Sequence, residues 1–334
     1  MIYTLTLNPA IDRELTVTEM QFDSVLSAVN SQVDFGGKGF NVSRLLKSMG
    51  MPSTALAFVG GRTGERLRHG LQALGIQTDF VAVSGETRTN ISIVTERHDH
   101  YIKVNEKGPM VAESQQRELL DKIATIAGPG DWWVLAGSLP PGVPDSFYAR
   151  IIEILHEHKA ITILDTTGES LRLGCAAKPF LVKPNAEELQ RLTDLPVDIT
   201  QQIAVAAGEL RKMGAQNVVV SLGKKGALLH TAAGNWLIHS PKIKEKNPIG
   251  AGDSMVGGLV WALSQGIPLK EALGWGTASG AATASLSGTE VGSRPLIEEL
   301  FQKVKYDSLD MAQAAVPRDA SLWGGEDAAE SILK

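Results

Sequence analysis

A short glycine-rich stretch, residues 247–254, has the residue types best suited to chemistry. It reads Asn-Pro-Ile-Gly-Ala-Gly-Asp-Ser, and apolar residues follow it at helical spacing. The pattern predicts a helix that begins where the glycines end. The first turn of a helix has N–H groups without partners and a partial positive charge, and glycines let a phosphate approach them closely. A carboxylate in the same turn could take a proton from an attacking hydroxyl.

Two interpretations of this stretch are open from its residues alone. In the first, the amides of Gly250, Ala251 and Gly252 form an anion hole, and Asp253 is the base of a phosphoryl transfer. In the second, the glycines only form a turn, and Asp253 is an ordinary N-terminal helix cap.

A second glycine-rich segment, residues 36–42, opens another predicted helix and reads Gly-Gly-Lys-Gly-Phe-Asn-Val. Close backbone approach at Gly37 and hydrogen bonds from Lys38 and Asn41 could hold a polyhydroxyl substrate. The plain alternative is a glycine-rich loop with an incidental lysine. The segment is not a Walker A loop, because no Ser or Thr follows Gly-Lys at the required spacing. No full dinucleotide-binding fingerprint follows the first strand either.

Two basic residues, Arg88 and Lys103, lie on a predicted hairpin within residues 86–104. Strand patterns at residues 16–18 and 29–35 precede any predicted helix, so these segments and the hairpin are expected to form a small separate sheet. Isolated basic residues on strands are usually only solvated. The more specific hypothesis is that Arg88 and Lys103 together bind a phosphate already present on the substrate.

The rest of the chain alternates strands and helices from residue 54 to residue 222. That alternation predicts a mostly parallel sheet with helices on both faces. Functional residues in such a sheet belong at the carboxyl ends of the strands. Five predicted strands end in polar or glycine residues: Asp12, Gly137-Ser138, Asp165, Lys183 with Asn185, and Ser221 with Gly223.

The composition is that of an ordinary globular protein: 334 residues, 43% hydrophobic, 21% charged, with a formal net charge of −5. No block of basic residues is present, so nucleic acid is not an expected partner. The single cysteine, Cys175, excludes an internal disulfide and fits a reducing compartment. A predicted strand opens the sequence and no apolar run reaches about 18 residues. We therefore expect no signal peptide, no membrane contact and a cytoplasmic location.

The two glycine-rich segments resemble the two signatures of the ribokinase-like (PfkB) carbohydrate kinases, and residues 137–142 and 183–188 also match family segments. The resemblance runs from residue 3 to about residue 304. It is greatest to the phosphosugar branch, which contains 1-phosphofructokinase, tagatose-6-phosphate kinase and the minor bacterial 6-phosphofructokinase. It implies a three-layer αβα fold with a mostly parallel central sheet and a small β-sheet lid.

The resemblance also implies a division of the chain. Residues 1–305 would form one kinase domain, into which lid segments at about residues 10–36 and 86–108 are inserted. Residues 306–334 carry six acidic and two basic residues, and we expect a loosely ordered acidic tail.

Each matched position acquires an implied role. Sugar hydroxyls would be bound by Asp12, Gly37, Lys38 and Asn41. The phosphate already on the substrate would be bound by Arg88, Asn90 and Lys103, with help from Ser138. The anion hole and the base would again be Gly250–Gly252 and Asp253.

The implied nucleotide site lies at the other strand ends. Lys183 and Asn185 would lie beside the phosphates of ATP, and Ser221, Gly223 and Gly226 would meet its phosphates and ribose. Ser285 occupies a position at which the family commonly has an asparagine near the adenine. Asn185 and Glu188 would organise Mg²⁺, largely through water.

The resemblance implies ATP-dependent phosphorylation of a hexose phosphate, with fructose 1-phosphate to fructose 1,6-bisphosphate as the first expectation. Tagatose-6-phosphate kinase and 6-phosphofructokinase are alternatives. Val25 stands where some 6-phosphofructokinases have a basic residue, which argues against fructose 6-phosphate, and Pro248 replaces a threonine common in the family. A kinase of unphosphorylated sugars is disfavoured by Arg88 and Lys103. A non-catalytic sugar-phosphate-binding protein is disfavoured by an intact Asp253. Family lids often pair, so a homodimer through the lid is expected.

Overall fold

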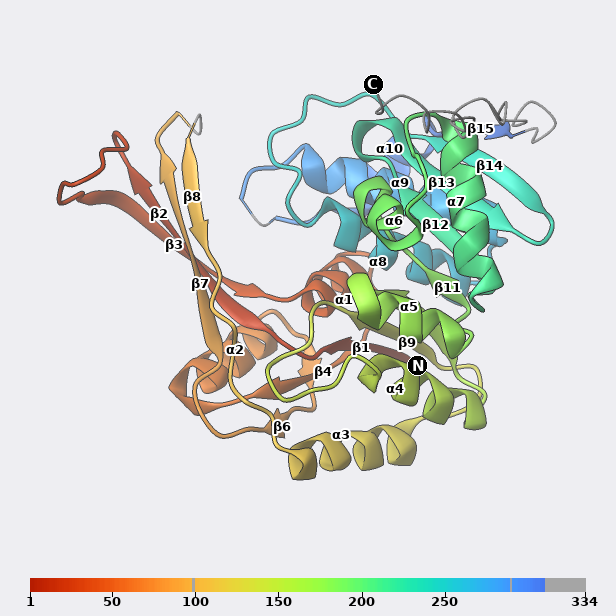
Figure 1. Cartoon of the computed structure of the whole chain (residues 1–334). Coiled ribbons are helices and arrows are strands. Elements are labelled where there is room, and N and C mark those ends of the chain that lie inside the picture. The colour runs from red at the N-terminus through yellow and green to blue at the C-terminus, as the bar shows by residue number, and fades with distance from the viewer. Residues whose placement is uncertain (98–99, 289, 310–334) are drawn as a thin grey trace, which may run out of the picture.

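The computed structural model describes residues 1–97, 100–288 and 290–309 (Figure 1). Its large sheet has 11 strands and its small sheet has four. From one edge to the other, the large sheet contains β15 (Lys305–Ser308), β14 (Gly234–His239), β13 (Gly226–Thr231), β12 (Asn217–Ser221), β11 (Leu181–Val182), β10 (Ile161–Asp165), β9 (Trp132–Ala136), β1 (Ile2–Thr6), β4 (Thr54–Val59) and β5 (Gln77–Thr78), with β6 (Val81–Ala82) also paired to β4.

The large sheet is parallel from β5 through β12, and its last three strands are joined as antiparallel pairs. Strands joined by helical crossovers bury both faces, so their sequences are nearly continuous in apolar residues. The predicted fold class, a mostly parallel sheet in an αβα arrangement, is confirmed.

Alternating side chains on the strands contact different helices. Leu5 and Leu135 pack in one core, whereas Ile2 and Val134 pack in the other. The first core is covered by α3 (Glu113–Ile126), α4 (Phe147–Glu157), α5 (Gly168–Ala176), α6 (Ala186–Thr193) and α7 (Thr200–Lys212). The opposite face is covered by α1 (Lys38–Ser48), α2 (Gly61–Ala73), α8 (Ala251–Ser264) and α9 (Leu269–Ala284), with α10 (Arg294–Phe301) packed on α9.

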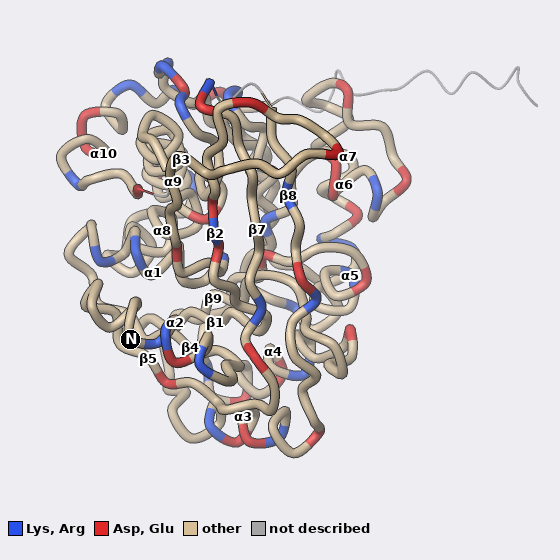
Figure 2. The backbone as a smooth tube through the Cα atoms, turned by 90° about the vertical axis from the view of Figure 1, so that its left-hand side faces the viewer, with Lys and Arg blue, Asp and Glu red and all other residues tan. Residues whose placement is uncertain are grey.

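The small sheet contains both segments that were expected to form a lid, and we call it the lid. Its strand order is β3 (Ala28–Gly36), β2 (Ala10–Val17), β7 (Arg88–Thr95) and β8 (Tyr101–Val104). In Figure 1 its far end stands clear of the helices, and Figure 2 shows the four strands side by side in front of the body. The parallel register of β2 with β7 places Asp12 opposite Asn90.

Three details differ from the sequence-based expectations or extend them. Asp12 does not end the first strand of the large sheet, because β1 stops at Thr6 and Asp12 lies within lid strand β2. Helix α5 was not anticipated. Strand β15 reaches Ser308 and pairs with β14, so the first residues assigned to the tail join the large sheet. Residues 310–334 of that predicted tail lie outside the described residues. None of the helices in the described part of the chain is long and apolar enough to cross a membrane.

Candidate active site

Asp253 lies in the first turn of α8, at the carboxyl ends of the central strands. The N-cap of α8 is Gly250, whose φ of 78° is the left-handed conformation that glycine adopts readily. Asp253 comes three residues later and is therefore not the helix cap, which removes the second interpretation of this stretch. The residue is 9% exposed. Its Oδ2 accepts a hydrogen bond of 2.8 Å from Nδ2 of Asn41 in α1.

The surroundings of Asp253 raise the pKa of its carboxyl to about 6. Burial is the largest cause, and the negative charge of Asp165 adds to it. The Asn41 hydrogen bond, Lys38 and Lys183 act in the opposite direction. A carboxyl with a pKa near neutrality is suited to general base catalysis.

Asp165, the last residue of β10, forms two ion pairs behind Asp253. Its Oδ1 lies 2.9 Å from Nζ of Lys38, and its Oδ2 lies 3.1 Å from Nζ of Lys183. Only 1% of the Asp165 side chain is exposed. Burial alone would raise the pKa of this carboxyl, but the two lysines outweigh burial and lower it. A charged triad is therefore built into the floor of the site.

The lid meets the body at a second polar cluster. Asn90 donates a hydrogen bond of 2.8 Å to Asp12. Arg88 donates to the backbone carbonyls of Asn8 and Glu106, at 2.9 and 3.0 Å. Nε of Arg88 and Oδ1 of Asn90 are buried without a hydrogen-bond partner among the described residues. Such groups are costly unless a ligand or water pairs with them.

The other predicted substrate residues lie around this cluster at different distances. Nδ2 of Asn8 donates a hydrogen bond of 3.5 Å to Oγ of Ser138. Lys103 is exposed on β8 and pairs in register with Ser92, two residues beyond Asn90. Because alternate residues of a strand share a face, Lys103 lies on the same face of the lid as Asn90, but farther from the body. A small cavity of about 40 Å³ is lined by Asp12, Asn41 and Gly250, among others.

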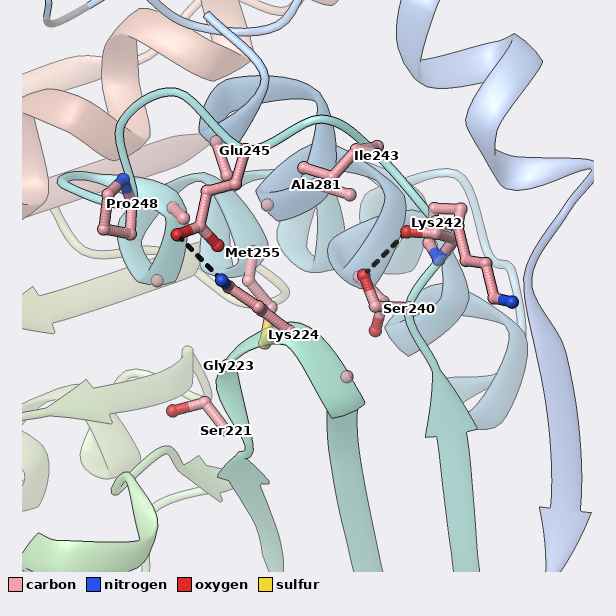
Figure 3. Close-up of a pocket in the computed structure, with 17 residues that line it drawn as sticks. Ser221, Gly223, Lys224, Ser240, Lys242, Ile243, Glu245, Pro248, Met255 and Ala281 are labelled. Carbon is pink, nitrogen blue, oxygen red and sulfur yellow. Dashed lines mark hydrogen bonds and ion pairs between the residues drawn. The ribbon is translucent and has the colours of Figure 1, made fainter.

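A larger cavity of about 620 Å³ is also lined by residues at the α8 start (Figure 3). Its lining includes the predicted residues Ser221, Gly223, Gly226, Ala251 and Gly252. Nζ of Lys224 lies 3.5 Å from Oε1 of Glu245. Figure 3 shows this ion pair at the cavity. Apolar residues complete it: Ile243, Pro248, Met255, Ala281 and Ala284. The volume and the mainly apolar lining suit a nucleotide base, and the glycines suit its phosphates.

Ser285 does not line this cavity. It is the C-cap of α9, and its hydroxyl donates to the carbonyl of Ala282 at 2.7 Å. Ala281 and Ala284 of the same helix do line the cavity. Lys224 and Glu245 were missed by sequence reasoning, because charged residues in loops give no signal of where they meet.

The Asn-x-x-Glu segment forms a capping box at the start of α6. The amide of Glu188 donates to Oδ1 of Asn185 at 2.8 Å, and the amide of Asn185 donates to Oε2 of Glu188 at 2.9 Å. The box leaves Oε1 of Glu188 for another partner. Burial lowers the pKa of Lys38, but the negative charges of Asp165, Asp253 and Glu188 together raise it above its usual value. No group of three or more His, Cys, Asp or Glu side chains that could hold a metal is found in the described residues. One carboxylate oxygen fits a magnesium ion that keeps most of its waters.

Comparisons with known proteins agree with this geometry. The chain matches the pfkB family carbohydrate kinases over residues 4–295. It is 36% identical over 309 residues to the 1-phosphofructokinase of Bacillus subtilis, covering 92% of this chain and 100% of the relative. It is also 36% identical over 289 residues to the D-tagatose-1-phosphate kinase of Bacillus licheniformis, covering 86% of this chain and 94% of the relative.

A solved structure resembles the whole described fold. The phosphofructokinase-2 of Escherichia coli in complex with potassium superposes with a TM-score of 0.86 and 31% identity, covering 90% of this chain and 98% of that one. With both glycine-rich segments, the parallel sheet and the lid in place, the chain belongs to the pfkB family of carbohydrate kinases, phosphotransferases that use an alcohol group as acceptor.

Proposed function

We propose that the protein transfers the γ-phosphoryl group of ATP to the C6 hydroxyl of fructose 1-phosphate, giving fructose 1,6-bisphosphate and ADP. One observation carries the proposal: the glycine-rich start of α8 contributes to the lining of two separate cavities. Ala251 and Gly252 face the nucleotide-sized cavity, and Gly250 faces the cavity shared with Asp12. Asp253 is buried in the same turn.

The chemistry needs one base and a site for developing negative charge. The C6 oxygen attacks Pγ, the bond from Pγ to the bridging oxygen of ADP breaks, and ADP leaves with that electron pair. Asp253 accepts the C6 hydroxyl proton. The first-turn amides of α8 and Lys183 would stabilise the charge on the transferring group. A Cβ built at Gly252 would lie 3.7 Å from Lys183 Nζ, so the amine is close to this turn.

The substrate would span the space from Asp253 to the lid. Asp12, Gly37 and Asn41 would bind its hydroxyls. Lys38 would also reach these hydroxyls while it stays paired with Asp165. Its phosphate would be held by Asn90 and by the Nε–H of Arg88, which has no partner among the residues that the structure describes, with Lys103 and Ser138 beside them. Magnesium, held through water by Asn185 and Glu188, would neutralise phosphate charge when bound.

The choice of fructose 1-phosphate rests on the relatives' names. Two relatives at 36% identity are named for 1-phosphofructokinase and D-tagatose-1-phosphate kinase activities, both of which specify a phosphate at position 1. A coupled assay of ADP release should compare fructose 1-phosphate, tagatose 1-phosphate, tagatose 6-phosphate and fructose 6-phosphate. We expect the highest kcat/KM for fructose 1-phosphate. A higher value for a 6-phosphate would move the proposal to the alternative kinases, and no ADP release with any of them would favour a binding protein.

We further propose that two copies associate through their lids. The β2–β7–β8 register places Leu15, Ile91, Ile93, Ile102 and Val104 on one face of the lid. Val104 is 58% exposed, Ile102 37% and Ile91 36%. Arg13 is in register with Ile91 and lies on the same face, which is otherwise mostly apolar. A sheet with an open, mostly apolar face and free edges is stabilised when a second copy covers it.

A further inference from the structure

Asp165 has no part in the proposed proton or phosphoryl transfer, yet it is among the most buried charges of the site. Its side chain is 1% exposed and is bonded at both carboxyl oxygens. A buried carboxylate in this setting is costly unless it is fully paired. Its partners are lysines from two distant segments, one at the start of α1 and one just after β11.

The two lysines would not adopt this arrangement without Asp165. Lys183 is 6% exposed, and Lys38 is 36% exposed, so both amines are partly or fully removed from water. Both face one carboxylate, and two ammonium groups held this close would repel each other if that carboxylate were neutral. Lysine side chains are flexible, so their direction depends on the group that binds them.

Both amines also act on Asp253. The groups that set the charge on the Asp253 carboxyl are Asp165 at the end of β10, Lys38 and Asn41 on α1, and Lys183 after β11. Lys183 lies beside Gly252, in the turn that would hold the transferring phosphoryl group. Asp165 is thus behind the reaction centre, with one positive group on each of its oxygens.

We propose that Asp165 is a positioning residue of the kinase reaction, which holds Lys38 and Lys183 on two sides of the base and the transferring phosphoryl group. This inference deepens the proposed function and rests on it. Asp165 contacts neither substrate; its effect passes through the two amines. Its removal should therefore lower kcat more than it raises either KM.

The first test compares Asp165→Asn with the wild type at pH 8. Misplacing groups at a reaction centre by about 1 Å costs about 10²-fold in rate, so we expect kcat to fall by that order, with both KM values within about threefold. The amide also removes a negative charge near Asp253, so the acid limb of the kcat profile should move to lower pH.

The matched variant is Lys38→Met, which removes a positive charge from the same cluster. Here the acid limb should move to higher pH, opposite to Asp165→Asn. A general loss of packing would lower activity without moving the two limbs in opposite directions. The proposal would be overturned if the acid limbs of the two variants' kcat–pH profiles stayed at the wild-type pH, or if both moved in the same direction.

If the asparagine variant does not fold, Asp165→Glu tests the same proposal. The longer side chain retains the charge but displaces both amines, so kcat should fall while the acid limb stays near its wild-type pH. A wild-type kcat in this variant would overturn the inference. Failure of the proposed function would be seen separately, as wild-type protein that releases no ADP with any ketose phosphate.

Discussion

The carboxyl of Asp253 must be charged to act as a base, and its surroundings make that charge costly. Burial and Asp165 raise its pKa to about 6, while Asn41 donates a hydrogen bond that holds the carboxyl in place. A base with this pKa is mostly ionised at neutral pH and is still a good proton acceptor.

Replacing Asp253 with asparagine should keep both substrates bound and lower kcat by about 10²–10⁴-fold, the usual contribution of base catalysis. Steady-state ADP release gives kcat, and calorimetric titration gives the affinity for each substrate. Near-wild-type turnover in this variant would remove Asp253 from the role of base.

The same substitution should raise thermal stability, in a pH-dependent way. The pKa of Asp253 is raised from 3.8 to about 6. Between these values the folded protein holds a proton that the unfolded chain has lost, so the free energy of unfolding falls as the pH rises through this window. Above pH 6 the cost is fully present. We expect Asp253→Asn to have a Tm at least about 2 °C above wild type at pH 8, and the difference to vanish near pH 4. A constant difference at all pH values would contradict the raised pKa.

At the scale of elements, the lid and helix α6 each contain a residue that makes structural hydrogen bonds and keeps a polar atom for a ligand. Arg88 links lid strand β7 to the body through two carbonyls, and it keeps one buried N–H without a protein partner in the described chain. The capping box of α6 holds Asn185 and Glu188 in place while one carboxylate oxygen is left over.

Replacing Arg88 with alanine should raise the KM for the phosphosugar at least about 10-fold and the KM for ATP by less than about twofold, because a guanidinium–phosphate contact would be lost. The control is Arg13→Ala, which removes an exposed arginine of lid strand β2 next to Asp12 but on the opposite face. An equal rise in both KM values for Arg88→Ala would place Arg88 outside the phosphate site.

Two substitutions of Glu188 should separate its cap from its proposed metal role. Glu188→Gln keeps an oxygen for the Asn185 amide, so the Tm should stay near wild type while the Mg²⁺ concentration for half-maximal activity rises several-fold. Glu188→Ala should lose both the helix cap and the metal contact, and its free energy of unfolding should fall by about 0.5–2 kcal/mol. Magnesium titrations and thermal unfolding of the two variants decide this; an unchanged magnesium requirement in both would exclude Glu188.

At the scale of the whole molecule, the open lid face predicts a dimer. Val104→Asp places a charge at a 58% exposed position of that face, at the end of edge strand β8. We expect light scattering to give twice the chain mass for the wild type and the mass of one chain for the variant. The matched control, Lys103→Ala, changes the neighbouring residue on the opposite face of β8 and should leave the mass unchanged. A monomeric wild type at micromolar concentration would refute the lid dimer.

The sequence by itself determined the family, the parallel sheet and most of the local elements. Glycine-rich helix starts and alternating strand–helix patterns are local features, so the residue order alone locates Gly250–Asp253 and the start of α1. Strand-end positions also indicated Asp165, Lys183 and Ser221, because parallel strands bring their carboxyl ends to one edge.

Only the tertiary structure decided which of these residues meet. Asp165 pairs with Lys38 across 127 positions of sequence, and Asn41 reaches Asp253 across 212. No local pattern encodes such a pairing. For the same reason the sequence did not show that Asp12 lies within lid strand β2, or that Ser285 is outside the lining of the larger cavity. Local propensities depend on neighbours a few residues apart, whereas burial, charge pairing and pKa depend on which distant segments the packed sheet brings within a few ångströms.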